Sequence, residues 1–318
     1  MCKVAILSVP ILAFALLLQT LAAAPPAQPA TAQSQPAAPK PPPPPPEGVN
    51  VIRDVEYAKV ADISLLMDIY IPKDARGALP CVMYIHGGGW RRGDKHQQTG
   101  VPLGTHGYVV ASINHRTSFQ AVFPAQIEDC KAAIRFLRAS ADKYHIDPKH
   151  MGVWGDSSGG HLSALVGTSG DVKALEGTVG NHADQSSRVQ AVCVYYGPID
   201  FLAILNQKSD IKRGEFPGAP EAQLLGGRTL DKKDLAIAAN PITYITKDDP
   251  PFLIVHGAKD IRVPIAQSQA LRDALKAAGV EANLELIAGA GHGFNAEQQA
   301  RALPLVLTFF NKHLKTAP

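Results

Sequence analysis

A serine set among glycines is the first place in this sequence where the residue types could do chemistry. Residues 155–160 read Gly-Asp-Ser-Ser-Gly-Gly, which fits the spacing Gly-x-Ser-x-Gly when it is centred on Ser157. This spacing is typical of a sharp strand-to-helix turn, where glycines leave room for an exposed serine hydroxyl. Centring on Ser158 would require a glycine at position 156, where Asp156 stands. We therefore predict that Ser157 is a nucleophile and that Ser158 follows it.

A second glycine run, His-Gly-Gly-Gly-Trp at residues 86–90, directly follows a strand-like apolar stretch. Backbone N–H groups in such a run can line up without side-chain obstruction and stabilise a developing oxyanion. We predict that Gly88 and Gly89 supply these donors, together with the N–H of Ser158 at the start of a helix. We expect Trp90 to wall the substrate pocket, and a packed structural role is the alternative.

A catalytic serine of this type needs an acid and a base downstream, in the order Ser, Asp, His. Asp260 lies just beyond a strand-like run, in "HGAKDIRVP", and His292 lies beyond the next run, in "GAGHGF". We predict that His292 accepts the Ser157 proton and that Asp260 orients and stabilises the imidazole. Asp200, Asp248 and Asp249 are rival acids, but only Asp260 has the matching loop. A structural role is the alternative for His161, which follows the serine turn, and for His256, at a strand end.

Apolar runs and helical patterns alternate along the chain after about residue 78 and must position these groups. The patterns predict strands at 81–86, 108–114, 151–154, 189–197, 251–257 and 282–288, and helices at 127–144, 263–279 and 303–314. Such alternation indicates an α/β protein with a mostly parallel central sheet and helices on both faces. Two earlier runs, 51–58 and 63–72, predict an antiparallel edge hairpin. This pattern excludes a trypsin-like protease, which would be all-β with its histidine and aspartate before the serine.

The N-terminal residues predict export. Residues 1–24 combine a short basic start, a long apolar run and a final Ala-Ala-Ala, which is typical of a signal peptide. An uncleaved membrane anchor is the alternative. Residues 25–47 are rich in proline and alanine and predict a disordered, extended linker. We therefore expect a secreted or periplasmic catalytic domain at 48–318 that has no stable membrane insertion after cleavage.

The composition narrows the classes of partner and cofactor. The 318 residues include 31 Lys and Arg and 28 Asp and Glu, with no dense basic cluster, so a nucleic-acid partner is not expected. Cys81, Cys130 and Cys193 lie in apolar contexts, which predicts buried free thiols. No Cys and His pair has the spacing of metal ligands, and the proposed mechanism needs neither a metal ion nor an organic cofactor. The composition does not indicate an oligomeric state.

With these residues identified, the chain resembles the α/β-hydrolase carboxylesterases of the hormone-sensitive-lipase-like group, and in particular the bifunctional feruloyl and acetyl-xylan esterases. The resemblance runs from about residue 50 to the C-terminus, on the motifs "YIHGGGW", "GVWGDSSGGHLSALVG", "YYGPID", "NPITYI", "PPFLIVHGAKDIRVP" and "GAGHGF". It implies the α/β-hydrolase fold and a serine esterase that forms an acyl-enzyme. The implied substrates are acetyl or feruloyl esters of plant polysaccharide, or other small short-chain esters.

One feature separates this chain from parts of that group, and a second resemblance leaves another function open. Relatives of hormone-sensitive lipase usually carry helical cap residues before the first strand, where this chain has its proline-rich tract. We therefore expect a lid-like insert at about 200–245 to decide specificity. The motifs around Asp260 and His292 also resemble prolyl-oligopeptidase-type peptidases, so a peptidase or an arylformamidase acting on an amide is the alternative function. A binding module without catalysis would have a broken triad, and here every triad position is filled.

Overall fold

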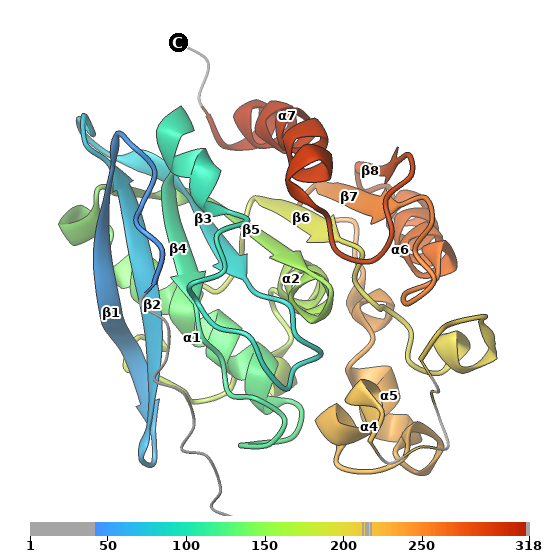
Figure 1. Cartoon of the computed structure of the whole chain (residues 1–318). Helices are drawn as coiled ribbons and strands as arrows, with labels where there is room; N and C mark the ends of the chain where they lie inside the picture. Colours follow the sequence, from blue (N-terminus) through green and yellow to red (C-terminus); the bar gives the residue numbers. More distant parts are fainter. Residues whose placement is uncertain (1–41, 212, 214–215, 217, 316–318) are drawn as a thin grey trace, which may run out of the picture. The chain divides into compact units, whose positions relative to one another are not determined.

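An eight-stranded sheet lies at the centre of the structure, a computed structural model that describes residues 42–211, 213, 216 and 218–315 (Figure 1). In spatial order the strands are β1-β2-β4-β3-β5-β6-β7-β8. Their bounds are β1 Val49–Val60, β2 Ile63–Pro72, β3 Leu79–Ile85, β4 Val109–Ile113, β5 Ile146–Asp156, β6 Ala191–Tyr195, β7 Phe252–Gly257 and β8 Ala282–Ile287. β2 pairs antiparallel with β1 and β4, and all other pairs are parallel. The predicted α/β class, with a mostly parallel sheet and an N-terminal hairpin, is confirmed.

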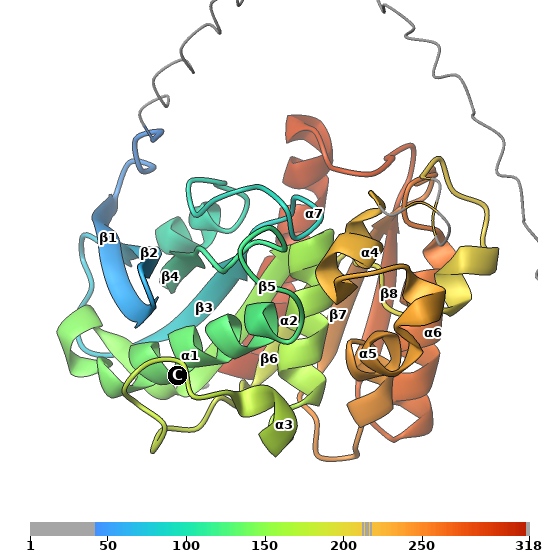
Figure 2. The ribbon, with the colours of Figure 1, turned by 90° about the horizontal axis from the view of Figure 1, so that it is seen from below.

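Helices cover both faces of this sheet, as Figures 1 and 2 show. They are α1 Ala125–Ala139, α2 Ser158–Thr168, α3 Lys173–Glu176, α4 Pro220–Leu225, α5 Lys233–Ala238, α6 Ile265–Ala277 and α7 Ala296–Leu314. One apolar core contains residues of α1, α2 and α6, and a second core contains residues of α7. The sheet therefore separates two cores, one on each face.

Strand β3 shows why the central strands read as continuous apolar runs. Cys81 and Met83 belong to the core beneath α1 and α2, whereas Val82 and Tyr84 belong to the core beneath α7. Successive side chains of a strand point to opposite faces, so a strand buried on both faces must be apolar throughout. Residues Cys81–Ile85 are accordingly all buried.

The three cysteines of the described residues are free and buried. Burial raises the pKa of the Cys81 thiol to about 12, so the thiol stays protonated and unreactive at neutral pH. These thiols pack as small apolar side chains.

The predicted signal peptide at 1–24, and residues 25–41 of the predicted linker, lie outside the described residues. Contacts within the chain define a compact unit from Pro42 onward. Within the described part of the chain, none of the helices combines the length and apolarity that a membrane span requires.

Two helix boundaries differ from the sequence prediction by more than two residues. Helix α1 ends at Ala139, and a separate 3-10 turn at Asp142–Tyr144 places Tyr144 in the core. Helix α7 begins at Ala296, before the predicted 303, because Asn295 and Gln298 form a capping box at its start. The helix also continues through Pro304.

The predicted insert at about 200–245 lies between β6 and β7 and contains short helices. Besides α4 and α5, it holds the 3-10 turns Ala203–Asn206, Thr229–Asp231 and Pro241–Tyr244. The N–H of Phe123 donates a hydrogen bond of 2.8 Å to Leu224 O, and Arg91 Nη1 donates one of 3.2 Å to Gly218 O. The insert therefore packs beside the segments that follow β3 and β4.

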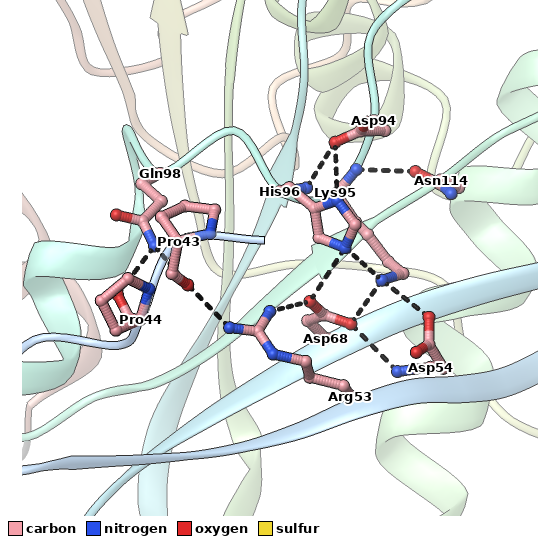
Figure 3. A network of polar contacts seen from close by, with 10 residues as sticks. All are labelled: Pro43, Pro44, Arg53, Asp54, Asp68, Asp94, Lys95, His96, Gln98 and Asn114. Atoms are coloured by element: carbon pink, nitrogen blue, oxygen red, sulfur yellow. Dashed lines mark hydrogen bonds and ion pairs between the residues drawn. The ribbon is translucent and has the colours of Figure 1, made fainter. Parts of the chain in front are cut away.

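A buried ionic network joins β1 and β2 to the loop after the glycine run (Figure 3). Asp68 on β2 is fully buried, and its carboxylate lies 2.7 Å from Lys95 Nζ and 2.8 Å from Arg53 Nη1. Lys95 also lies 2.9 Å from Asp54, and its N–H donates to the side chain of Asn114. A buried carboxylate requires such partners, because water no longer solvates its charge.

The end of the proline-rich tract contacts the same network (Figure 3). Arg53 Nη2 donates a hydrogen bond of 2.7 Å to Pro43 O, and Gln98 Nε2 donates one of 3.2 Å to Pro44 O. The last part of the predicted 25–47 linker is therefore held against β1 and the loop that follows the glycine run.

We expect Lys95→Met to lower the free energy of unfolding by about 3 kcal/mol, because it leaves the Asp68 carboxylate buried with one cation fewer. Urea unfolding followed by circular dichroism measures this loss. Lys73→Met is the matched control, since Lys73 is exposed. An equal effect of the two substitutions would contradict the role given to Lys95.

Candidate active site

A sharp turn at the end of β5 presents Ser157. The backbone of Ser157 has φ 52° and ψ −118°, and helix α2 begins at the next residue. This positive φ is strained for a residue that carries a Cβ. A Cβ on Gly159 would lie 2.0 Å from Ile85 O, and one on Gly155 would lie 2.3 Å from Gly159 O. Glycine at both positions is therefore required for the turn, as the sequence spacing indicated.

The structure brings the three predicted triad residues together. Ser157 Oγ lies 2.9 Å from His292 Nε2, and His292 Nδ1 lies 2.8 Å from Asp260 Oδ2. Asp260 follows β7 and His292 follows β8, so both lie at the carboxyl ends of the parallel strands. In this arrangement Nδ1–H donates to the carboxylate, so Nε2 is free to accept the serine proton.

The surroundings of Asp260 keep its carboxylate ionised. Burial acts to raise its pKa, but hydrogen bonds from His256 and His292 outweigh this effect and hold the pKa of Asp260 well below its usual range. The N–H groups of Arg262 and Val263 also donate to Oδ1, at 2.8 and 3.0 Å. The negative charge that stabilises an imidazolium is therefore present even in mild acid.

His256, for which the sequence suggested a structural role, directly contacts Asp260, the predicted acid of the triad. Its Nε2 lies 2.9 Å from Val263 O and 3.3 Å from Asp260 Oδ2, and its Nδ1 lies 2.7 Å from Ser268 Oγ. Ser268 therefore donates to Nδ1, while Nε2–H faces the loop that contains Asp260 and Val263. The position of His256 at the end of β7, four residues before Asp260, was the sequence signal for this contact.

The predicted oxyanion donors lie around Ser157. Gly88, Gly89 and Ser158 line the same cavity as Ser157, and no described residue accepts a hydrogen bond from their N–H groups. Gly88 and Gly89 have φ of 129° and 65°, a conformation that favours glycine. Free backbone donors beside a nucleophile can bind the oxygen that becomes negative during acyl transfer.

His86 stabilises the glycine loop through a hydrogen bond to its backbone. It is buried, its ring stacks on His115 with centroids 4.8 Å apart, and its Nδ1 lies 2.8 Å from Gly87 O. Burial lowers the pKa of His86 to about 4, so the ring is neutral at physiological pH. A neutral ring that donates through Nδ1 fixes the carbonyl of Gly87.

Asp156 is a site residue that the sequence analysis considered only in setting the register of the turn. Its carboxylate accepts hydrogen bonds from the hydroxyl of Tyr84, from Gly87 N at 3.1 Å and from Gln97 Nε2 at 3.1 Å. Burial raises the pKa of Asp156. The side chain therefore ties the nucleophile turn to the glycine loop, and Gln97 extends this connection to the segment that Lys95 anchors.

Trp90, predicted to wall the pocket, is mainly a packed residue. It borders the cavity, but only 1% of its surface is exposed. Its ring packs edge-on against His161 and Phe201, at centroid distances of 5.2 and 5.4 Å. The indole therefore lies in the core, where it fixes the end of the glycine loop, and this corresponds to the alternative role.

Three of the rival residues, Asp200, Asp249 and His161, have local structural contacts. Asp200 accepts from the N–H groups of Leu202 and Ala203 at a turn, and Asp249 accepts from Thr246. His161 Nε2 lies 2.7 Å from Ala239 O inside the core. These contacts explain the side chains without a part in the triad.

The site opens into a cavity of about 390 Å³. The glycine loop, Ser157 and His292 line one part of it, while Ile211, Pro220 and Glu221 of the insert line another. The rings of Tyr196 and His292 pack edge-to-face, with centroids 5.0 Å apart. The insert therefore contributes directly to the walls of the substrate space.

We expect Ser157→Ala to lower the rate of ester cleavage by about 10⁴-fold or more, because the nucleophile is lost. Ser158→Ala should lower it by less than about tenfold, because the backbone N–H remains and the buried hydroxyl has no partner among the described residues. Steady-state kinetics with an aryl acetate measures both variants. If Ser158→Ala were the inactive one, the register of the turn would be wrong.

The lowered pKa of Asp260 also predicts a pH dependence of stability. The carboxylate stabilises the fold above the unfolded pKa of about 3.9, and this contribution is lost as the pH falls toward the lower folded pKa. Wild type should exceed Asp260→Asn by on the order of 2 kcal/mol at pH 6, and the gap should narrow below about pH 4. Urea unfolding across pH measures it, with the exposed Asp62→Asn as control. A gap that stays constant down to pH 3 would argue against this assignment.

A family model and several curated proteins match the sequence of this chain. The family model described as BD-FAE matches residues 67–275. Esterase LipC of Mycobacterium tuberculosis is 32% identical over 76% of this chain and 60% of its own length. The chain spans about half the length of the curated relatives it matches.

Solved structures of similar fold include proteins that are esterases by their titles. A truncated form of a carbohydrate esterase from gut microbiota is 34% identical with a TM-score of 0.73, and covers 84% of this chain and 98% of its own. A bifunctional GH43-CE protein of Bacteroides eggerthii is 38% identical with a TM-score of 0.74, over 83% of this chain and 35% of its own.

Proposed function

Because the chain belongs to the BD-FAE family of the α/β-hydrolase fold, we propose that its domain is a serine carboxylic-ester hydrolase that acts through an acyl-enzyme on Ser157. The predicted resemblance to esterases of this group is confirmed by the family match and by the esterase relatives.

The observation that carries the proposal is the continuous hydrogen-bonded line from Ser157 through His292 to Asp260. In the first step Ser157 Oγ attacks the ester carbonyl carbon while His292 Nε2 takes the hydroxyl proton. The carbonyl oxygen becomes negative and accepts hydrogen bonds from the backbone donors at Gly88, Gly89 and Ser158.

The intermediate collapses when the bond between the carbonyl carbon and the alcohol oxygen breaks. The His292 imidazolium gives its proton to the departing alcohol, which leaves an acyl group on Ser157. A water molecule then attacks the acyl carbon while His292 takes one of its protons, and the acid departs as Ser157 regains its hydrogen. Asp260 holds the imidazole in place and balances its positive charge in both halves of the reaction.

We further propose acetyl or feruloyl esters of plant polysaccharide, or other short-chain esters, as substrates. The resemblance to feruloyl and acetyl-xylan esterases supports this class, as does the carbohydrate esterase among the structural neighbours. Export through the predicted signal peptide at 1–24 would bring the enzyme to such polymers. The same triad can cleave an amide, as in prolyl-oligopeptidase-type peptidases or arylformamidases, but the relatives carry esterase names, which favours an ester.

The test is acetate release from acetylated xylan by the chain without its predicted signal peptide, with Ser157→Ala alongside. We expect release by the wild type and at least ~10⁴-fold slower release by the variant. Cleavage of 4-nitrophenyl acetate without release from xylan would support the esterase and reject the polysaccharide. Cleavage of a peptide or an aryl formamide in preference to all esters would reject the esterase.

A further inference from the structure

The described residues that line the cavity carry an excess of positive charge. Four arginines line it, Arg91, Arg92, Arg213 and Arg262, whereas the acidic lining residues are Asp156 and Glu221. The whole chain is nearly balanced, with 31 basic and 28 acidic residues. The charge of the cavity therefore differs from that of the chain as a whole.

The two acidic residues that line the cavity already have polar partners within the chain. Glu221 forms a buried ion pair with Arg213, so these two charges cancel. The carboxylate of Asp156 accepts hydrogen bonds from Tyr84, Gly87 and Gln97, and among the described residues no arginine pairs with it. Neither acid is therefore a partner for the remaining arginines.

The other lining arginines have weak or no ionic partners. Arg92 is exposed, and none of the described residues forms an ion pair or a hydrogen bond with its side chain. Arg262 lies 3.4 Å from Asp210, and its side chain is 49% exposed. Arg91 donates to neutral groups of the insert, at 3.2 Å to Gly218 O and 3.4 Å to the side chain of Gln223.

Arg92 and Arg262 come from two different walls of the site. Arg92 follows the glycine loop and packs against it, since a Cβ on Gly88 would lie 3.2 Å from Arg92 Cγ. Arg262 follows the catalytic acid, and its N–H donates to Asp260 Oδ1 at 2.8 Å. The two guanidinium groups therefore belong to the loops that carry the oxyanion donors and the acid.

We propose that this cavity selects esters that carry a carboxylate group, and that Arg92 and Arg262 recognise this group. This inference rests on the proposed esterase function and specifies its substrate class. Guanidinium groups bind carboxylates through paired, charge-assisted hydrogen bonds. Like charges along the wall of a cleft also focus the field and raise the local concentration of an anionic substrate.

Two matched pairs of esters test the proposal and separate the two parts of an ester that could carry the charge. 4-Acetoxybenzoate and its methyl ester differ by a carboxylate on the alcohol part, and monoethyl and diethyl adipate differ by one on the acyl part. We expect kcat/KM to favour the charged member of at least one pair, and the preference to shrink as the salt concentration rises.

Arg92→Gln and Arg262→Gln should each lower that charged-to-neutral ratio by about fivefold, the upper range for a partly exposed ion pair. Arg76→Gln is the matched control, because Arg76 is an exposed arginine in the loop before β3. This loop lies at the amino ends of the parallel strands, whereas the cavity lies at their carboxyl ends. Thermal unfolding of each variant checks that the fold is retained. An equal fall of the ratio in Arg76→Gln would reject a local role of the cavity arginines.

The outcomes separate this inference from the proposed function. If neutral esters are cleaved through Ser157 while Arg92→Gln and Arg262→Gln leave both ratios unchanged, the esterase stands and the carboxylate preference is wrong. If no ester is cleaved, the proposed function fails. In that case an NMR titration of Ser157→Ala with 4-acetoxybenzoate and with its methyl ester decides the inference. The inference requires that the charged probe binds more tightly than the neutral one. This difference in affinity must be lost when Arg92→Gln or Arg262→Gln is added.

Discussion

The left-handed backbone of Ser157 is the constraint on which the rest of the site depends. Holding a residue with a side chain in this conformation costs on the order of 1–3 kcal/mol, so the surrounding structure must impose it. Helix α2 is buried along its whole length, and Gly159 lets its first turn approach Ile85 O at the end of β3. This close approach places the nucleophile, the helix N-terminus and the glycine loop beside one another.

Two buried aspartates serve the site in opposite ways, because their partners differ. Asp260 accepts hydrogen bonds from two histidines and two backbone N–H groups, which hold its pKa low and keep it charged. Asp156 is buried with a tyrosine hydroxyl, an amide side chain and a single backbone N–H, and its pKa is raised. The first charge supports proton transfer by His292, and the second carboxyl joins the nucleophile turn to the oxyanion loop.

In the proposed reaction, the residues that break the ester bond and the residues that select the ester come from different regions of the chain. The triad and the glycine loop follow the ends of parallel strands, where the backbone is rigidly positioned. The insert between β6 and β7 and the arginines beside it line the remaining walls of the cavity. Changes in the insert can therefore alter the substrate while the chemistry of Ser157 is retained.

The sequence by itself predicted the α/β order of strands and helices from the alternation of apolar runs and helical patterns. Short motifs with a fixed spacing predicted the register of the nucleophile turn and the candidate triad. Such motifs work because glycine spacing and strand ends are local properties of the chain. Only the tertiary structure decided the contact of Gln97 with Asp156, the burial of Trp90 and the position of Arg92 and Arg262 in the lining of one cavity. These contacts join residues from separate loops, which the parallel sheet brings together and which no local pattern records.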